Sequence, residues 1–376
     1  MADEACEYAL CLSGGGYRAM LFHLGALRRL NELGYLKKLD RVSSVSGGSI
    51  AAGVLAKHWD SLGFDADGRA ANFDSTVAED IHSLAMRTLD SWAIVRGLTW
   101  FGPIGDRVAA AYNRHVFKGM KLSDLPDHPR FVFNATNLQT GSLWRFSKPY
   151  MADQKVGRVL DPTLELATAV AASSAFPPFL SPVKLEFDAG EIDTFPNAPT
   201  PEFHKEPYTR KVVLSDGGVY DNLGLQTASQ CQVLLVSDGG GYLKSKKRPW
   251  RNWPGHTYRV LNVIDSQVRA LRASHLVERF QERRARGEVP GALWTIRTPL
   301  AAYQLNDALP VSEGATEDLA AVKTRLGRLS PERQRQLVNW GYAACDASIR
   351  SNIGPPPDTE PPRPAPSFPY PDVGFD

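Results

Sequence analysis

The chain has 376 residues, with 43 Lys and Arg against 41 Asp and Glu, which gives a formal net charge of +2. Hydrophobic residues make up 43% and charged residues 22%, values typical of a globular protein with a sizeable core. They exclude a mainly disordered, collagen-like or coiled-coil chain. The near-neutral balance provides no overall basic field, so we expect no nucleic-acid partner.

Cysteine usage and the N-terminus indicate a cellular location. The four cysteines are Cys6, Cys11, Cys231 and Cys345. None forms a C-x-x-C pair and no His or Cys falls at zinc-ligand spacing, so we expect no zinc site, and buried thiols in a reducing compartment. No other metal and no cofactor is expected either. The N-terminus is acidic, its apolar run is too short for a signal peptide, and no stretch approaches 18 apolar residues. We therefore expect a cytoplasmic protein, with export by a signal-independent route left open.

The first 60 residues read as a βαβ unit with a parallel sheet. Residues 8–12 form a short apolar strand that enters a glycine turn. Residues 17–33 repeat apolar positions at helical spacing, and Gly34 ends that helix. A second strand at 41–45 runs into a Ser-Gly-Gly-Ser turn, and an apolar helix follows from 50 to about 59.

Together with this unit, the chain up to residue 354 is expected to form one domain, residues 1–354. Residues 60–125 are predicted to be a helical, aromatic-rich insertion, and 186–210 a loop. From residue 355 onward 9 of 22 residues are proline, which predicts an extended or disordered tail over 355–376. Further strands are expected at 130–136, 143–146, 211–214, 232–236 and 293–298, and further helices at 160–174, 260–286 and twice near the C-terminus.

Three predicted strands end in polar residues on glycine-rich turns, at the sheet edge where open α/β sheets bind ligands. The first turn, Ser44-Val45-Ser46-Gly47-Gly48, matches the nucleophile elbow G-x-S-x-G except that Ser44 replaces the first glycine. The small neighbours allow a strained turn that lifts the serine hydroxyl clear of the backbone. A Gly/Ser-rich loop without chemistry is the alternative.

The second turn is Ser13-Gly14-Gly15-Gly16, followed by Tyr17 and Arg18. Consecutive glycines at a helix N-terminus offer N–H groups to a developing oxyanion or to a phosphate. The spacing of Gly14, Gly16 and Ala19 also fits a dinucleotide fingerprint, but the second strand lacks an acidic residue at its end, because Asp40 lies at its start. No Gly-Lys-Ser/Thr follows, which excludes a P-loop.

The third turn is Asp216-Gly217-Gly218. A carboxylate on such a turn can face a serine on a neighbouring strand and act as its general base. The same Ser-Asp-Gly-Gly string recurs one strand later around Asp238.

These three motifs resemble the patatin-like phospholipase family. Its pattern is a G-G-G-x-R/K loop, a G-x-S-x-G serine and a D-G-G/A aspartate, in the order found here. The blocks at 134–141 and 171–177 are also similar to the family, and the resemblance covers roughly residues 8–240. Two positions depart from it: Ser44, and Ser13, where many relatives carry Asp.

The resemblance implies a three-layer α/β/α fold with a central, mainly parallel sheet. It implies a Ser–Asp dyad with Ser46 as nucleophile and Asp216 as base, without a catalytic histidine or a metal. The N–H groups of Gly14, Gly15, Gly16 and Gly47 would bind the oxyanion, and Arg18 would help to hold that loop. Asp216 rather than Asp238 is followed by Val-Tyr-Asp-Asn-Leu-Gly, as the family's aspartate typically is, so Asp238 is expected to cap a turn.

The implied activity is cleavage of phospholipid or lysophospholipid esters through an acyl-serine. Acyl transfer by the same dyad, or a lipid- or partner-binding protein with a vestigial site, are the alternatives. The order of Ser46, Asp216 and then His256 or His275 imitates a Ser…Asp…His triad, but His275 lies in a predicted helix among charged residues, where a solvated face is the better interpretation. His23 is expected to pack against the glycine loop.

A lipid acyl hydrolase must meet a membrane, a micelle or a lipid carrier. Basic residues cluster with tryptophan in one segment, which suits an anionic lipid interface or an ordinary solvated loop. The aromatic segment 92–101 could be a lid or acyl channel, although core is favoured. A regulatory partner or ligand is plausible, but no residues identify one. The basic and tryptophan cluster comprises Lys244, Lys246, Lys247, Arg248 and Arg251 with Trp250 and Trp253.

Overall fold

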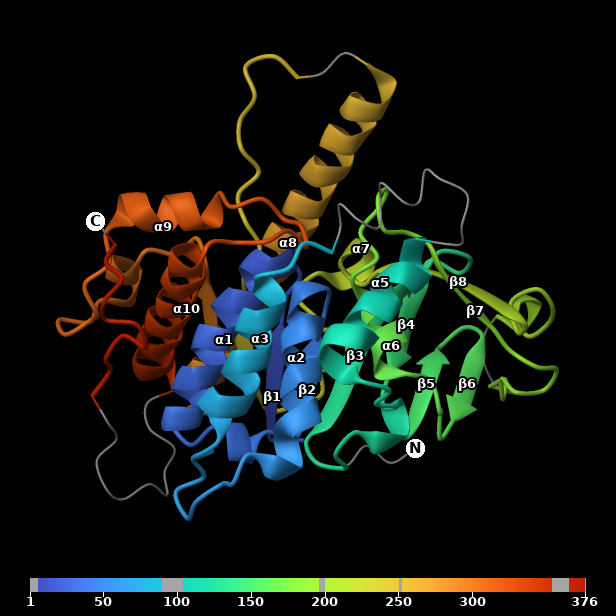
Figure 1. Cartoon of the computed structure of the whole chain (residues 1–376), viewed down its shortest axis with the longest axis horizontal. Helices are drawn as coiled ribbons and strands as arrows, with labels where there is room; N and C mark the ends of the chain where they lie inside the picture. The colour runs from blue at the N-terminus through green and yellow to red at the C-terminus, as the bar shows by residue number, and fades with distance from the viewer. Residues whose placement is uncertain (1–5, 90–103, 196–199, 250–251, 354–364, 376) are drawn as a thin grey trace.

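The computed structural model describes residues 6–89, 104–195, 200–249, 252–353 and 365–375. In these ranges ten strands form one sheet whose path runs β10-β9-β1-β2-β3-β4-β5-β6, while β8 pairs with β3 and β7 pairs with β8 (Figure 1). The strands are β1 (Tyr8–Leu12), β2 (Arg41–Ser44), β3 (Arg130–Asn137), β4 (Ser142–Phe146), β5 (Tyr150–Asp153), β6 (Gly157–Leu160), β7 (Val183–Glu186), β8 (Lys211–Asp216), β9 (Val233–Asp238) and β10 (Ala292–Thr295).

The strands β10, β9, β1, β2 and β3 are mutually parallel, and the remaining pairs are antiparallel. Leu12, the last residue of β1, pairs with Ser44 of β2 and Ser237 of β9, so these three strands end at one level. The predicted α/β fold with a parallel centre is therefore confirmed. The strands β5, β6 and β7 were not predicted from the sequence.

Helices cover both faces of the sheet (Figure 1). They are α1 (Gly16–Glu32), α2 (Gly47–His58), α3 (Glu79–Ala85), α5 (Ile104–Tyr112), α6 (Leu166–Ser173), α7 (Gly218–Asp221), α8 (Trp253–Ala285), α9 (Glu313–Ala320) and α10 (Pro331–Asn352). Short 3-10 or π turns lie at Leu36–Lys38, Trp59–Ser61, Asp74–Ala78, Asn113–Phe117, Leu122–Asp124, Pro201–Phe203 and Leu300–Tyr303.

Alternation along β1 divides the core into two layers. Leu10 and Leu12 join the large cluster that includes the apolar faces of α1, α2 and α10. Cys11, which points the other way, joins a smaller cluster with Leu276 and Phe280 of α8. Because successive strand residues face opposite sides, one five-residue apolar strand supports helices on both faces. The molecule is thus a three-layer α/β/α structure.

Several boundaries differ from the sequence prediction. The insertion at 60–125 is only partly helical, because its described part is broken by turns and short helical pieces around α3 and α5. The helix predicted from residue 160 begins at Leu166, and Leu160 belongs to β6. The aromatic segment 92–101 lies outside the described residues. In the described ranges no helix is both long and apolar enough to cross a membrane.

The described part of the Pro-rich tail packs onto the domain. The Tyr370 hydroxyl lies 2.8 Å from Nε2 of His82 in α3, and the Tyr370 N–H donates to the side-chain oxygen of Asn339 in α10. Phe375 is buried against the main core. Residues 365–375 therefore contact the domain through hydrogen bonds and apolar packing.

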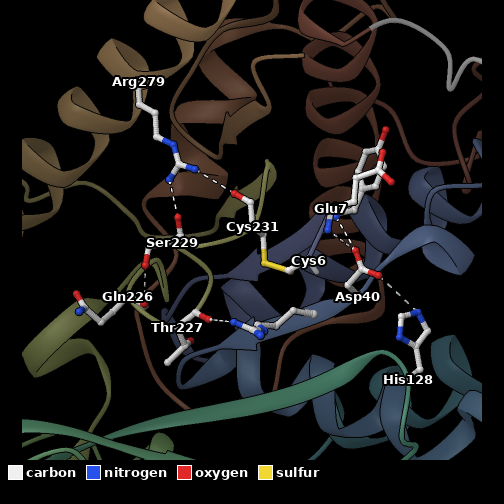
Figure 2. The surroundings of a disulfide bond; sticks show 11 residues. Cys6, Glu7, Asp40, His128, Gln226, Thr227, Ser229, Cys231 and Arg279 are labelled. Atoms are coloured by element: carbon white, nitrogen blue, oxygen red, sulfur yellow. Dashed lines mark hydrogen bonds and ion pairs between the residues drawn. A yellow bond between two sulfur atoms is a disulfide. The ribbon is translucent and has the colours of Figure 1, made fainter. Parts of the chain in front are cut away.

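Cys6 and Cys231 form a disulfide, which corrects the prediction of four reduced thiols (Figure 2). Cys6 precedes β1 and Cys231 precedes β9, and the parallel pairing of these strands brings their starts together with a Cα–Cα distance of 4.6 Å. Cys11 and Cys345 are buried and free. Spacing in the sequence gave no hint of the pair, because the two cysteines are 225 residues apart.

Candidate active site

Ser46 lies in a strained turn between β2 and α2. Its backbone has φ 51° and ψ −118°, a conformation that L-residues rarely adopt. A Cβ on Gly47 would lie 2.2 Å from the carbonyl oxygen of Gly16, and one on Gly48 would lie 2.3 Å from that of Leu12. Glycine is therefore required at both positions, which is the physical basis of the elbow motif.

The departure at Ser44 fits this turn. Ser44 is fully buried, and its hydroxyl accepts a hydrogen bond from the Ser49 hydroxyl at 3.0 Å. It also donates to the backbone oxygen of Val132 on β3 at 3.3 Å. The extra hydroxyl is thus satisfied, so replacing glycine by serine here leaves no unpaired buried donor.

The strands that precede Ser46 and Asp216 share one edge of β3. β2 runs parallel to β3 and ends where Ser44 pairs with Phe133. β8 runs antiparallel to β3 along the continuation of the same edge and ends where Asp216 pairs with Ala135. The two strands point at each other, so their carboxyl ends meet beside Asn134. The sequence predicts that the strands before Ser46 and Asp216 end at the same edge of the sheet. In the structure β8 runs opposite to β2, so Asp216 approaches Ser46 from the opposite direction.

Asp216 is a buried carboxyl group poised near neutrality. Burial is the main cause that raises its pKa to about 7; the Gly218 N–H and the Ser46 side chain act against this rise, and Asp265 of α8 adds a smaller contribution to it. The Gly218 N–H donates to Oδ1 at 2.7 Å. The Ser46 side chain is thus near enough to Asp216 to lower the pKa of its carboxyl group. Among the described residues, Oδ2 of Asp216 nevertheless has no well-aligned hydrogen-bond partner.

The glycine loop lies against the Ser46 turn. A Cβ on Gly14 would be 3.2 Å from the Cβ of Ser46 and would collide with the Asn222 side chain. The Gly14 N–H donates to the Asn222 carbonyl oxygen at 3.1 Å, so it is not available to an oxyanion, contrary to the sequence prediction. Within the described part of the chain, the N–H groups of Gly15, Gly16 and Gly47 donate no hydrogen bond.

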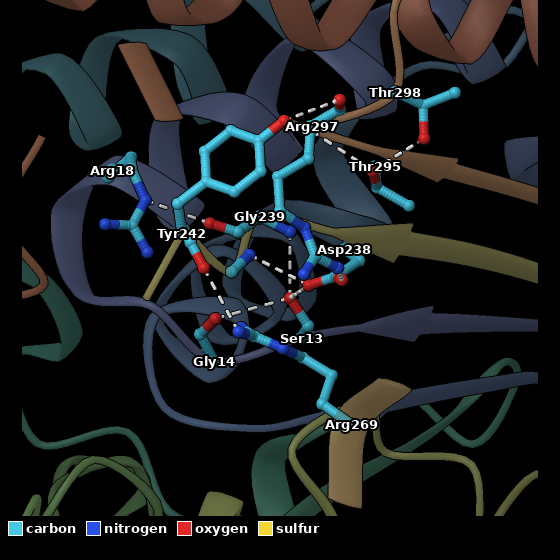
Figure 3. A network of polar contacts seen from close by, with 12 residues as sticks. Ser13, Gly14, Arg18, Asp238, Gly239, Tyr242, Arg269, Thr295, Arg297 and Thr298 are labelled. Carbon is cyan, nitrogen blue, oxygen red and sulfur yellow. Dashed lines mark hydrogen bonds and ion pairs between the residues drawn. The ribbon is translucent and has the colours of Figure 1, made fainter. Parts of the chain in front are cut away.

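Arg18 lies behind the glycine loop and hydrogen-bonds to carbonyl oxygens of two other segments. It is buried, its Nε donates to the Gly239 carbonyl oxygen at 3.0 Å, and its Nη1 donates to that of Val322 (Figure 3). Burial, together with repulsion from Arg269, lowers its pKa to about 10. The side chain thus ties α1 to the segment after β9 and to the segment around Val322.

Asp238 organises a polar network beneath the same loop (Figure 3). Its Oδ1 accepts hydrogen bonds from the Ser13 hydroxyl at 3.2 Å and from the Gly240 N–H at 2.8 Å. Its Oδ2 pairs with Arg297 at 2.6 Å. The hydrogen bond from the Gly240 N–H confirms that Asp238 caps a turn, as predicted. Burial alone would raise the pKa of Asp238, but the positive charges of Arg297 and Arg269 outweigh it, so the pKa is lowered.

The histidines do not form a triad with the candidate dyad. His23 is buried behind the glycine loop, with Nε2 2.9 Å from the Ser13 carbonyl oxygen and Nδ1 2.8 Å from the Ser237 hydroxyl. Burial lowers its pKa to about 4, so it is neutral. His256 and His275 are exposed on α8, and in the described ranges neither hydrogen-bonds to Ser46 or Asp216.

Sequence reasoning assigned no role to the groups that brace the site. The Ser46 N–H donates to the Ser173 hydroxyl at 3.1 Å, and this hydroxyl donates to the Asn134 carbonyl oxygen at 2.6 Å. The Thr136 hydroxyl donates to the Asp216 carbonyl oxygen at 2.8 Å. Asn134 and Thr136 belong to the block at 134–141, and Ser173 belongs to the block at 171–177. Both blocks were identified from the sequence as similar to the family, but no role was assigned to their residues. Among the described residues no three His, Cys, Asp or Glu side chains are grouped to hold a metal ion.

Comparisons with known proteins give one family match and several structural neighbours. A family model described as Patatin-like phospholipase matches residues 10–229. A search of curated proteins finds no match. Human GIVD cytosolic phospholipase A2 is 14% identical over 93% of this chain and 61% of that chain, with a TM-score of 0.53. VipD from Legionella pneumophila is 16% identical over 93% of this chain and 67% of that chain, with a TM-score of 0.37. The likeness to the human enzyme shows the fold, and the chain spans about two thirds or less of these longer proteins.

Proposed function

The chain belongs to the patatin-like phospholipase family, and from this membership we propose that it cleaves carboxylic esters of phospholipids or lysophospholipids. One observation carries the proposal. Two strands that share an edge of β3 end head to head, and this places the strained Ser46 beside the buried carboxyl group of Asp216. The glycine loop with unused N–H groups lies against the same turn.

In the proposed reaction, the Asp216 carboxylate takes the proton from the Ser46 hydroxyl as its oxygen attacks the ester carbonyl carbon. The N–H groups of Gly15, Gly16 and Gly47 stabilise the negative charge on the carbonyl oxygen. As the intermediate collapses, the carbon–oxygen bond to the leaving alcohol breaks, and Asp216 gives its proton to that alcohol. An acyl-Ser46 remains.

Water then completes the cycle. Asp216 takes a proton from water while the hydroxyl attacks the acyl carbonyl, and it returns this proton to the Ser46 oxygen as the fatty acid leaves. A carboxylate with its ordinary pKa of 3.8 would be a weak base, but burial raises the pKa of Asp216 to about 7. That value suits a group that both accepts and donates a proton near neutral pH, the role a histidine has in other serine hydrolases.

Intact-mass analysis after treatment with a fluorophosphonate tests the nucleophile. We expect one adduct on the native chain, none on Ser46→Ala, and strongly slowed labelling of Asp216→Asn. Ser75→Ala, which changes a serine outside the site, is the matched control and should label as the native chain does. Release of fatty acid from phosphatidylcholine and its lyso form tests the substrate. Labelling that persists in Ser46→Ala, or no labelling of the folded native chain with phospholipid vesicles present, would contradict the proposal.

A further inference from the structure

The N-terminal half of α8 projects from the body of the molecule (Figure 1). Its inner side is anchored near the candidate site, because Arg272 donates to the Tyr220 carbonyl oxygen at 3.0 Å and Arg269 donates to that of Gly241 at 3.1 Å. Its outer side is apolar and exposed, with exposed fractions from 39% to 80%. The exposed side chains are Trp253, Val260, Leu261, Val263, Ile264, Val268 and Leu271.

The outer side chains form one stripe along the helix. Trp253, Val260, Ile264 and Leu271 follow one another at steps of seven, four and seven residues, which places them on one face. A soluble helix ordinarily turns such a stripe toward the core, and a contiguous exposed apolar patch marks an interaction surface. Here the inward face of the helix carries polar groups such as Arg269 instead, so the apolar stripe is left without a partner among the described residues.

The charge around this stripe is one-sided. From residue 239 to residue 264 the chain contains six Lys and Arg and no Asp or Glu. Lys244, Lys247 and Arg248, in the segment that leads into α8, are exposed. Tyr242 and Trp253 are exposed aromatic residues of the same segment and helix start, at 49% and 80%. Basic residues next to exposed aromatic and aliphatic side chains complement an anionic lipid surface.

The stripe is also close to the candidate active site. Phe176 and Phe179, which follow α6 and its Ser173, have ring centroids 6.4 and 6.1 Å from that of Tyr258 in α8. Asp265, one residue after Ile264, is near enough to raise the pKa of Asp216. Lipid held on the outer side of α8 would therefore lie across this helix from the side chains that face the candidate site.

We propose that α8 docks this protein on anionic phospholipid surfaces, with the stripe of Trp253, Val260, Ile264, Val268 and Leu271 in the apolar boundary and Lys244, Lys247 and Arg248 on the head groups. The biological purpose of this docking rests on the proposed function, since a docked molecule would bring phospholipid substrate to Ser46. A second copy of the chain is the less suitable occupant, because a two-fold contact would bring two basic, acid-free segments together.

Vesicle flotation of the full chain tests the docking. The Ser46→Ala background keeps the lipid intact, and the probes are vesicles of phosphatidylcholine with and without phosphatidylglycerol. We expect binding to the mixed vesicles that weakens with salt. Ile264→Glu with Leu271→Glu should weaken it about a hundredfold, because two side chains lose apolar burial. Leu160→Glu is the matched control, since Leu160 is 51% exposed on β6 and Ile264 is 53% exposed on α8.

A second pair of variants tests the charges. Lys244→Glu with Lys247→Glu should abolish the preference for phosphatidylglycerol, and Lys184→Glu with Lys205→Glu, also at exposed positions, should preserve it. Hydrolysis of soluble p-nitrophenyl butyrate by the chain with Ser46 intact should be unaffected by the α8 variants. Failure of that hydrolysis in the parent chain contradicts the proposed function alone. The docking proposal is overturned if the parent and Ile264→Glu/Leu271→Glu bind vesicles equally well. It is also overturned if the parent binds no vesicles and instead forms a dimer that these two changes dissociate.

Discussion

The hydroxyl of Ser173 joins the backbone of Ser46 to that of Asn134, because it accepts the Ser46 N–H at 3.1 Å and donates to the Asn134 carbonyl oxygen at 2.6 Å. Asn134 in turn donates to the Ser44 carbonyl oxygen at 3.0 Å. One side chain at the end of α6 thus fixes the strained turn against β3. A turn in a rare conformation persists only when its surroundings hold it in this way.

Ser173→Ala should therefore impair the site more than the fold. The Ser46 N–H would lose its partner in a buried setting, which costs about 1–3 kcal/mol. We expect fluorophosphonate labelling of Ser46 to slow about tenfold or more, since 1.4 kcal/mol corresponds to tenfold. Ser174→Ala is the neighbouring control, because the Ser174 hydroxyl bonds to Val170 within α6 and to Tyr112. Equal labelling rates for both variants at equal unfolding midpoints would show that Ser173 does not position Ser46.

The pKa of Asp216 predicts how activity depends on pH. The proposed base is active as the carboxylate, and burial raises its pKa to about 7. kcat/KM for a soluble ester should therefore rise with pH through an apparent pKa near that value and then level off. Asp265→Asn removes a charge that raises the pKa of Asp216, so it should shift the profile to lower pH. A profile in the native chain that levels off below pH 5 would contradict this assignment.

The same group makes stability depend on pH. Its pKa in the folded chain is about 7, against an ordinary value of 3.8. Between these values the folded state binds more protons than the unfolded state, so the free energy of unfolding falls as pH rises. The loss is on the order of 4 kcal/mol once pH exceeds the folded pKa. Asp216→Asn should flatten this part of the urea-unfolding profile, and an unchanged slope in the variant would argue against it.

Asp238→Asn should be strongly destabilising. The carboxylate is 1% exposed and pairs with Arg297, and it also bonds to Ser13 and Gly240. Removing one partner of a buried pair costs about 3–5 kcal/mol, because the other charge stays uncompensated. Urea unfolding measures the loss. Asp307→Asn, which breaks an exposed pair with Arg350, should leave the unfolding midpoint nearly unchanged, because exposed ion pairs contribute little to stability.

The Cys6–Cys231 disulfide should stabilise the chain. It closes a loop of 225 residues, and removing a native disulfide typically costs about 2–5 kcal/mol. Dithiothreitol should lower the unfolding midpoint of the native chain but not that of Cys6→Ala/Cys231→Ala. Alkylation of the unfolded, unreduced protein should label Cys11 and Cys345 only. Labelling of all four thiols would show that the pair is reduced and would favour the predicted cytoplasmic location, since disulfides persist in oxidising compartments.

The sequence by itself predicted the elements whose causes are local. Gly47 and Gly48 are needed because the backbone passes within contact distance of Gly16 and Leu12, and such a requirement leaves a readable motif around Ser46. The same holds for the glycine loop at the start of α1 and for Asp216 on its Gly-Gly turn. Short apolar strands that alternate with helices predicted the parallel centre of the sheet, because strands buried on both faces read as continuous apolar runs.

Only the tertiary structure decided what depends on pairing between distant segments. The head-to-head meeting of β2 and β8 on one edge of β3 determines that Asp216 approaches Ser46 from the opposite direction, and no local pattern encodes strand direction. The Gly14 N–H is used by Asn222, more than 200 residues away. The disulfide follows from the register of β1 and β9, and the exposed stripe of α8 from which face of that helix packs. These contacts bring together residues far apart in sequence, so their geometry exists only in the folded chain.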